Sequence, residues 1–364
     1  MKEKKIIISG GGTAGHLYPA LTVGNKLIEK NPHLRLTFVG SNRELERNIM
    51  KHYKAEFIAL KIEGIKGRGL KTIKSLFLLP FSFLKSFAIL LRIKPCLVIG
   101  VGGYSSGPIV LLASLMRIPT LILEQNLYPG LTNRLLLRWV QKAAVSFKNS
   151  LPYFKGKGVF IGNPVREEFH HISPKKRTAH LTLLIFGGSQ GSHFLNKGIT
   201  ATLPLFKEEK EKLKIFHQTG KKDFDWVKKS YTQNNFKDVT VKSYFYEMAN
   251  YFQISDLVIC RAGATTVAEL IASQKASLLI PFSQATDNHQ ALNAGELAAI
   301  KGAEIILEEE FSPEILAGKV FYLLKNKEKI TQMEKNLAGL KTENVAEKIS
   351  GLCYELMESG RRSN

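Results

Sequence analysis

Short, almost purely apolar runs alternate along the chain with longer stretches in which apolar residues recur at helical spacing. The runs are rich in Ile, Val and Leu, and each ends at glycine or at polar residues. They fall at residues 4–9, 34–40, 96–103, 120–126, 181–188, 213–220, 256–263 and 276–282. Apolar strands that alternate with helices are typical of parallel sheets covered on both faces. The pattern therefore predicts an α/β fold.

The pattern starts twice. A strand followed by SGGGTAGH at residues 9–16 is echoed by a strand followed by FGGSQGS at 186–192. We predict two doubly wound, Rossmann-like domains that face a cleft, because ligands of such sheets bind beyond the carboxyl ends of the strands. The break falls near Gly162-Asn163-Pro164, which gives domains 1–163 and 164–339. The charged stretch 329–359 is interpreted as terminal helices, and Gly339 and Gly351 leave their continuity open.

Length and charge sharpen this picture. A chain of 364 residues suits two domains of about 150 to 200 residues each. The net charge is +21, and residues 1–163 carry nearly all of it, with 25 Lys and Arg against 7 Asp and Glu. An anionic partner of the first half is expected, and nucleic acid, an acidic membrane surface or a polyanionic substrate would each fit.

Cysteines and apolar runs indicate the compartment. The three cysteines are scattered and form neither a metal motif nor a disulfide framework, which suits a reducing environment. The first apolar run is too short for a signal peptide, and no stretch approaches the roughly 18 apolar residues of a membrane-spanning helix. We expect a cytoplasmic protein.

The first glycine loop has the spacing of a dinucleotide site, with Gly10, Gly12 and Gly15 in G-x-G-x-x-G. A nicotinamide enzyme needs an acidic residue at the end of the second strand, where this chain has Gly40 and Ser41. The oxidoreductase interpretation is therefore weak, and a ligand-free turn competes with it. Bare N–H groups of the loop could instead hold a phosphate.

His16 follows this loop directly, in the first turn of the expected helix. A helix N-terminus favours the neutral imidazole, which is the form that a general base requires. A capping or packing role is the alternative.

Further polar loops end other strands. They are VGGYSSGP at 101–108, LEQN at 123–126, GNPVRE at 162–167, CRAGATTVAEL at 260–270 and PFSQATDNHQALNA at 281–294. Amides, hydroxyls and carboxylates suit a carbohydrate that bears phosphate. Asp223-Phe224-Asp225 matches the D-x-D pattern of metal-dependent transferases, but KKDFDWVKK is interpreted as a solvated helix start. We find no zinc spacing, P-loop or covalent nucleophile, and expect neither a metal nor a cofactor.

Residues 69–95 combine many apolar side chains with lysines, and Pro80 interrupts the run. Burial against the sheet accounts for much of the segment. Around 73–85 we favour contact with an anionic membrane, to which each basic residue adds about 1 kcal/mol. The predicted membrane patch comprises Ile73, Leu76, Phe77 and Phe81 with Lys71, Lys74 and Lys85.

Seven motifs in order over residues 10–294 resemble the MurG family of bacterial N-acetylglucosaminyltransferases: GGGTAGHLYPA, GVGGYSSGP, EQNLYPGLTNR, GNPVR, GGSQGS, CRAGATTVAE and DNHQALNA. The resemblance implies a GT-B fold with an acceptor-binding N-terminal domain, a UDP-sugar-binding C-terminal domain, and a last helix at about 340–364 that returns to the first domain. It implies inverting transfer of N-acetylglucosamine from UDP-N-acetylglucosamine to the 4-hydroxyl of undecaprenyl-diphosphate-linked muramoyl-pentapeptide. It also implies a peripheral enzyme on the cytoplasmic side of the cell inner membrane.

Roles can be predicted for individual residues. His16 is the best candidate for the catalytic base, and the predicted acceptor contacts are Gly102, Gly103, Tyr104, Ser105 and Glu124. The resemblance implies the contacts to the donor. The predicted donor contacts are Thr13, Ala14, Gly15, Asn126, Arg166, Ser189, the backbone of Phe245, Ala264, Thr265, Thr266, Val267, Ala268, Glu269 on the ribose, and Gln290.

This chain departs from the family pattern in three places. Leu123 replaces a histidine, and Ala14 replaces a glycine. Residues 244–248 differ from the family's motif in their side chains, so only a backbone contact can be carried over to this stretch. A nucleotide-cofactor oxidoreductase is the alternative function. A basic nucleic-acid binder would explain the charge but not the glycine loops.

Overall fold

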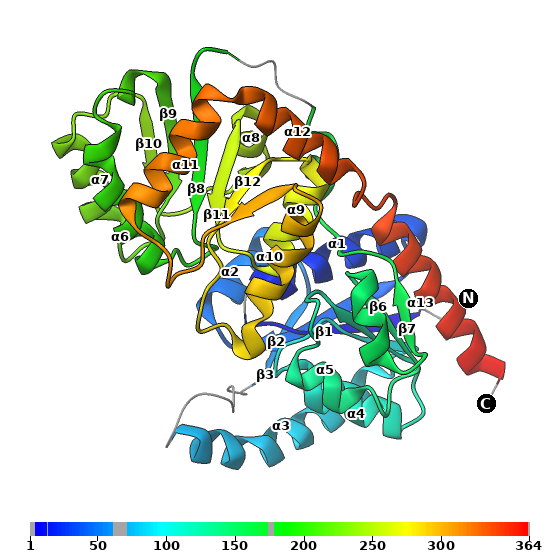
Figure 1. Ribbon diagram of the computed structural model, residues 1–364. Coiled ribbons are helices and arrows are strands. Elements are labelled where there is room, and N and C mark those ends of the chain that lie inside the picture. Colours follow the sequence, from blue (N-terminus) through cyan, green and yellow to red (C-terminus); the bar gives the residue numbers. More distant parts are fainter. Residues whose placement is uncertain (1–3, 13, 61–70, 174–177, 363–364) are drawn as a thin grey trace. The chain divides into compact units, whose positions relative to one another are not determined.

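The computed structural model describes residues 4–12, 14–60, 71–173 and 178–362. The chain forms two compact units (Figure 1): the first comprises Met1–Arg166 and Thr342–Asn364, and the second comprises Glu167–Lys341. The chain thus leaves the first unit just after the predicted break at 163–164, and its last helix belongs to that unit. That the two sheets face a cleft stays a prediction.

The described part of the first unit contains a seven-stranded parallel sheet in the order β3-β2-β1-β4-β5-β6-β7. Its strands are β1 Lys5–Ser9, β2 Arg35–Ser41, β3 Phe57–Leu60, β4 Leu97–Gly100, β5 Thr120–Glu124, β6 Lys142–Val145 and β7 Gly158–Phe160. Its helices are α1 Ala14–Lys30, α2 Glu44–His52, α3 Lys71–Ile93, α4 Ser106–Leu115, α5 Leu131–Leu136 and α13 Val345–Arg362. The strand order reverses between β1 and β4, where doubly wound sheets bind ligands.

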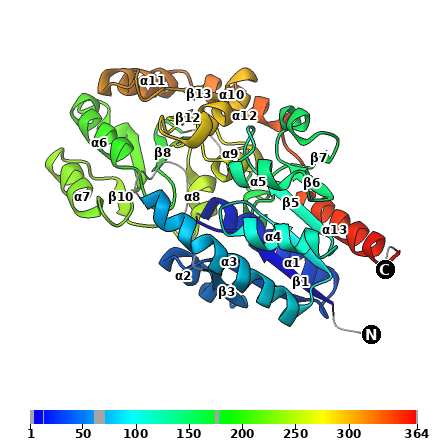
Figure 2. The ribbon, with the colours of Figure 1, turned by 90° about the horizontal axis from the view of Figure 1, so that it is seen from below.

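Burial on both faces explains the continuous apolar strands. Ile6 and Ile8 of β1 point into a core that includes α1 and α13. Ile7 points the other way, into a core shared with α3, α4 and α5, and α3 and α4 run side by side (Figure 2). Because successive strand side chains alternate between faces, every position of such a strand must be apolar.

The second unit repeats this plan with a six-stranded parallel sheet in the order β10-β9-β8-β11-β12-β13. Its strands are β8 Leu181–Phe186, β9 Leu213–Gln218, β10 Val239–Lys242, β11 Leu257–Cys260, β12 Ser277–Leu279 and β13 Ala303–Ile305. Its helices are α6 His193–Thr202, α7 Phe224–Gln233, α8 Met248–Ile254, α9 Ala264–Ser273, α10 His289–Ala299, α11 Pro313–Lys325 and α12 Lys327–Ala338. The predicted fold class is confirmed, with the reversal of strand order here between β8 and β11.

Helix α3 differs from expectation. The prediction that Pro80 interrupts its segment is wrong, because α3 runs through Pro80 from Lys71 to Ile93. An internal proline removes one backbone hydrogen bond without ending the helix when neighbouring turns are held by packing. Gly351 lies within α13, whereas Gly339 follows the end of α12. No helix in the described ranges is long and apolar enough to cross a membrane.

Helix α13 is joined to the first unit by an apolar stripe. Val345, Ile349, Cys353 and Met357 recur every four residues, and all are buried in the core that α13 shares with α1, β1 and β4. Near the start of the helix, Glu347 pairs with Lys30 of α1 at 2.5 Å. The stripe is therefore the main attachment of this C-terminal segment.

We predict that Ile349→Ala loosens the first unit alone. Ile349 is fully buried, and loss of such a side chain costs roughly 3 kcal/mol. Hydrogen exchange followed by mass spectrometry should show opening increased by up to roughly 100-fold in peptides from β1 and β4, with β8 and β11 unchanged. The exposed neighbour Lys348→Ala is the control. Equal effects in both units would contradict this assignment of α13.

Candidate active site

At the carboxyl edge of the first sheet, the loop after β1 and the loop after β4 lie backbone against backbone. A Cβ added to Gly10 would lie 2.8 Å from the carbonyl oxygen of Gly102, and one added to Gly103 would lie 2.3 Å from that of Gly11. Gly102 and Gly103 have φ of 91° and 78°, which glycine adopts readily. Only glycine allows the two loops to approach this closely at the point where the strand order reverses.

This approach positions His16, a half-buried residue in the first turn of α1. Its Nδ1 lies 3.2 Å from the carbonyl oxygen of Gly11. Since a carbonyl can only accept, Nδ1 carries the proton in this contact and a neutral ring has its lone pair on Nε2. A Cβ on Gly102 would lie 3.0 Å from that Nε2. The ring thus lies beside the loop that follows β4.

The expectation of bare N–H groups in this loop is wrong for Gly12. Its N–H donates to Oε1 of Glu46 at 2.5 Å, and Glu46 is fully buried in α2. Of the donor residues predicted here, Thr13 lies outside the described residues, and Ala14 and Gly15 begin α1. Sequence reasoning missed Glu46, although an acid soon after the second strand was the available signal.

Glu124 is the last residue of β5, and its carboxylate points into the loop that follows this strand. Its carboxylate accepts hydrogen bonds from the N–H groups of Asn126 and Gly130 and from the side chains of Asn126 and Asn133. Burial raises the pKa of Glu124, and these hydrogen bonds oppose the rise. The carboxylate therefore orders the loop that carries Asn126, while its predicted acceptor contact stays a prediction.

The other first-unit candidates lie on the same loops or beside α1. Tyr104 is half-buried, and Ser105 is buried directly before α4. The guanidinium of Arg166 lies over the ring of Tyr18 in α1, 4.5 Å from its centroid. A cation held in this way keeps its charge while the side chain is immobilised.

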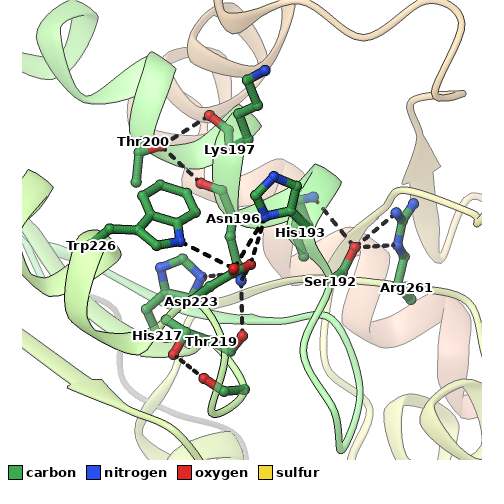
Figure 3. Close-up of polar contacts among 12 residues, drawn as sticks. Ser192, His193, Asn196, Lys197, Thr200, His217, Thr219, Asp223, Trp226 and Arg261 are labelled. Atoms are coloured by element: carbon green, nitrogen blue, oxygen red, sulfur yellow. Dashed lines mark hydrogen bonds and ion pairs between the residues drawn. The ribbon is translucent and has the colours of Figure 1, made fainter.

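In the second unit, the buried side chain of Arg261 connects four strand ends. It donates to Oγ of Ser192 in the loop after β8 (Figure 3). It also donates to the carbonyl oxygens of Ile280 and Pro281 after β12, and pairs with Glu308 beyond β13 at 2.5 Å. Burial lowers the pKa of Arg261, and Glu308 opposes that shift. One cation thus fixes the loops that surround the start of α9.

Predicted donor contacts lie on these loops. Ala264 to Glu269 form the first turns of α9, and Ser189 lies half-buried in the loop after β8. Gln290, in α10, accepts hydrogen bonds from the N–H groups of Ala262 and Phe282. Because its oxygen is engaged, Gln290 would meet a ligand through its amide nitrogen.

Sequence reasoning missed Gln218, at the end of β9. Its amide donates to the carbonyl oxygen of Gly188 at 2.9 Å, and its oxygen accepts from the N–H of Phe245 at 2.7 Å. The contact predicted for Phe245 would therefore use its carbonyl group. Gln218 joins the glycine loop to the segment that contains Phe245.

A helix does start at KKDFDWVKK, as predicted, since α7 begins at Phe224, but the expectation that this start is solvated is wrong for Asp223. Its carboxylate is buried and accepts hydrogen bonds from Asn196 and Trp226, with His193 Nδ1 3.1 Å away (Figure 3). Burial raises the pKa of Asp223, but these partners outweigh it and leave the pKa lowered. Asp225 is exposed.

The network continues into the core of the second unit. His217 Nε2 contacts the side-chain oxygen of Asn196 (Figure 3). Its Nδ1 contacts the hydroxyl of Tyr231. Burial lowers the pKa of His217 to about 3, so this ring is neutral at physiological pH. Among the described residues, no group of three or more His, Cys, Asp or Glu could hold a metal ion.

Two doubly wound sheets, each with a glycine loop where its strand order reverses, form the GT-B fold, which glycosyltransferases such as MurG have. The glycosyltransferase family 28 N-terminal domain matches residues 6–145, and the glycosyltransferase family 28 C-terminal domain matches residues 182–349. The chain belongs to this family and, within it, to the MurG family.

The relatives and solved structures agree. The UDP-N-acetylglucosamine–N-acetylmuramyl-(pentapeptide) pyrophosphoryl-undecaprenol N-acetylglucosamine transferase of Myxococcus xanthus is 40% identical over 97% of this chain and 93% of that protein. The protein of the same name from Desulfotalea psychrophila is 38% identical over 98% of both chains. The crystal structure of Acinetobacter baumannii MurG has a TM-score of 0.76 at 27% identity, covering 97% of this chain and 99% of that one.

A shared fold identifies the function of a protein less specifically than sequence identity does. UDP-GlcNAc 2-epimerase from Neisseria meningitidis has a TM-score of 0.68 at 14% identity, covering 96% of this chain and all of that one. The family is therefore established by sequence identity, and none of these comparisons supports the oxidoreductase alternative.

We predict that Asp223→Asn destabilises the second unit in a pH-dependent way. Hydrogen bonds to a charged group contribute about 1.5 to 3 kcal/mol. Since the pKa of Asp223 is lowered from 3.8, this contribution is present above that value and is lost as the pH falls through the lowered pKa. The stability difference from the unsubstituted protein should therefore be largest at pH 7 and shrink toward pH 3.

Urea unfolding followed by Trp226 fluorescence in a Trp139→Phe background measures this difference. Asp225→Asn, which neutralises an exposed carboxylate two residues away, is the control and should have little effect. A loss for Asp223→Asn that does not change with pH would show that the charge contributes nothing.

Proposed function

We propose that this chain transfers N-acetylglucosamine from UDP-N-acetylglucosamine to the 4-hydroxyl of undecaprenyl-diphosphate-linked muramoyl-pentapeptide, with inversion at the anomeric carbon. Its relatives at 36–40% identity over nearly their whole length carry the name of this transferase. Within the chain, the observation that supports the proposal most is the contact of His16 with Gly11. It places a lone pair on Nε2 beside the loop that follows β4.

In this mechanism the first unit activates the acceptor. His16 Nε2 takes the proton of the acceptor hydroxyl as its oxygen attacks the anomeric carbon of the donor sugar. A bond forms between that oxygen and the anomeric carbon, and the bond from the same carbon to the diphosphate breaks. The electron pair of the broken bond leaves with UDP, and the proton remains on His16.

The second unit stabilises the leaving group. Charge develops on the diphosphate as it departs, and fixed cations and helix N-termini lower the energy of that charge. The start of α9 lies beside Arg261, which is held by Ser192, by Glu308 and by two carbonyl groups. A site that is ordered before the reaction needs little reorganisation when the charge appears.

Replacement of His16 tests this assignment. We predict that His16→Ala lowers kcat by about 100- to 10,000-fold, because a positioned general base contributes that much. The KM for UDP-N-acetylglucosamine should change little. Turnover is measured as disaccharide formed with both substrates saturating. Near-normal kcat would make His16 a positioning residue and would require another base.

We also propose that the enzyme acts as a peripheral protein on the cytoplasmic side of the inner membrane, through α3. This helix exposes Phe81, Leu84, Phe87 and Leu91 along one strip, at 69, 68, 43 and 50%. It buries Ser82 and Ser86 on the side that faces the protein. A helix whose outer strip is apolar, in a unit with a large excess of basic residues, suits an anionic bilayer.

The other residues of the predicted membrane patch also belong to α3. Lys85 is exposed, and its Nζ donates to the carbonyl oxygen of Ala59. Lys71, Ile73, Lys74, Leu76 and Phe77 belong to the first turns of α3, and their side chains lie outside the described residues.

We predict that Phe81→Asp with Leu84→Asp weakens binding to phosphatidylglycerol vesicles by roughly 100-fold, since burial of two such side chains contributes about 3 kcal/mol or more. Sedimentation with the vesicles measures binding. Ile315→Asp with Tyr322→Asp, two exposed positions on α11, is the matched control and should bind normally. Unchanged binding by the α3 variant would exclude this surface.

A further inference from the structure

Both backbone polar groups of Gly12 are bound by side chains from the start of α2. Arg43, directly before the helix, donates from Nη1 to the carbonyl oxygen of Gly12 at 2.5 Å. Glu46, in the first turn, accepts the N–H of Gly12 at 2.5 Å and also accepts the hydroxyl of Ser41. A cation and an anion thus hold one glycine from two sides.

The surrounding glycines make room for the carboxylate of Glu46. A Cβ added to Gly11 would lie 2.6 Å from Oε2 of Glu46, and so would a Cβ added to Gly40. Glu46 has no exposed surface, and within the described part of the chain its Oε2 has no hydrogen-bond partner. A buried carboxylate with so few donors is costly to keep in a fold. The two groups that donate to it, the N–H of Gly12 and the hydroxyl of Ser41, link the loop after β1 to the end of β2.

The peptide group between Gly11 and Gly12 connects Glu46 to His16. Its N–H, from Gly12, is bound by Glu46, and its carbonyl group, from Gly11, accepts from Nδ1 of His16. A peptide between two glycines can rotate easily, and Gly12 has a φ of 96°. Because hydrogen bonds in series polarise one another, a carboxylate on the N–H strengthens the carbonyl as an acceptor.

We propose that Glu46, assisted by Arg43, is a positioning residue that acts on His16 through the Gly11–Gly12 peptide. It fixes the orientation of the peptide so that the carbonyl holds the proton on Nδ1, which keeps the lone pair of the neutral ring on Nε2. The consequence for catalysis rests on the proposed function of His16. The effect on the tautomer does not depend on it.

Two variants test the proposal. Glu46→Gln keeps the shape and an acceptor for the N–H of Gly12 but removes the charge, and Arg43→Ala removes an exposed side chain without opening the core. The first readout is the ¹⁵N spectrum of imidazole-labelled protein, in which His16 is assigned from the signal lost in His16→Gln. The second is kcat and KM for both substrates.

We expect His16 in the unsubstituted protein to carry its proton on Nδ1. Glu46→Gln should shift the ring toward a mixture of tautomers and lower kcat by roughly 10-fold or more with KM nearly unchanged. Arg43→Ala should act in the same direction and more weakly. Arg47→Ala is the control, because Arg47 lies in the same helix, is exposed and contacts Asn42.

The outcomes separate this proposal from the transferase assignment. A proton on Nε2 of His16 in the unsubstituted protein, or Glu46→Gln and Arg43→Ala variants with unchanged tautomer and kcat, would overturn the role of Glu46 even if transfer is observed. The expected change of tautomer in a protein that forms no disaccharide would support the role of Glu46 and count against the proposed function.

Discussion

The close approach of backbone to backbone at the carboxyl edge of each sheet governs the arrangement of the loops that carry the candidate site residues. In the first unit, the loops after β1 and β4 meet at positions where any Cβ would collide with a carbonyl group. In the second, a Cβ on Gly191 would lie 2.0 Å from the carbonyl oxygen of Thr219, and one on Gly220 would lie 2.1 Å from that of Gln190. Neighbouring parallel strands, β1 with β4 and β8 with β9, bring these loops together at the carboxyl edge of each sheet, and glycine removes the side chains that would separate them.

Glycine-rich loops have few side chains that could hold them in place by packing. Hydrogen bonds from buried charged or polar groups hold the loops of both units instead. Glu46 holds Gly12, Glu124 holds the loop of Asn126, and Arg261 holds Ser192. A buried charge is stable only where hydrogen bonds or an opposite charge compensate it. Each of these groups therefore forces its partner loop into one arrangement. In the proposed mechanism, this order would let the N-terminus of α9 and His16 act without prior rearrangement.

Much of the fold could be predicted because burial on both faces leaves a plain signal. The eight apolar runs correspond to β1, β2, β4, β5, β8, β9, β11 and β12. The strands that were missed, β3, β6, β7, β10 and β13, have three or four residues and lie toward the sheet edges. Sequences such as GVF and AEI are too short to show a period.

Residues of the candidate site could be predicted where they stand in a loop motif. Residues that hold such a loop from a distant part of the sequence could not. His16 and the glycines stand in recognisable motifs, whereas Glu46 and Gln218 act through contacts across 34 and 27 positions. The burial of Asp223 could not be predicted, because the charged residues around it are exposed, while the fold directs its carboxylate toward Asn196 and Trp226. Long-range polar contacts of this kind depend on the folded arrangement of the strands.

The most direct test of this account is the identity of the product. The full chain is incubated with UDP-N-acetylglucosamine and a short-chain analogue of the lipid-linked muramoyl-pentapeptide, in several lipids and detergents. The account predicts a β-linked disaccharide on the lipid together with an equivalent amount of UDP. Failure to form disaccharide under all these conditions, or conversion of the donor to another sugar nucleotide without transfer, would contradict it.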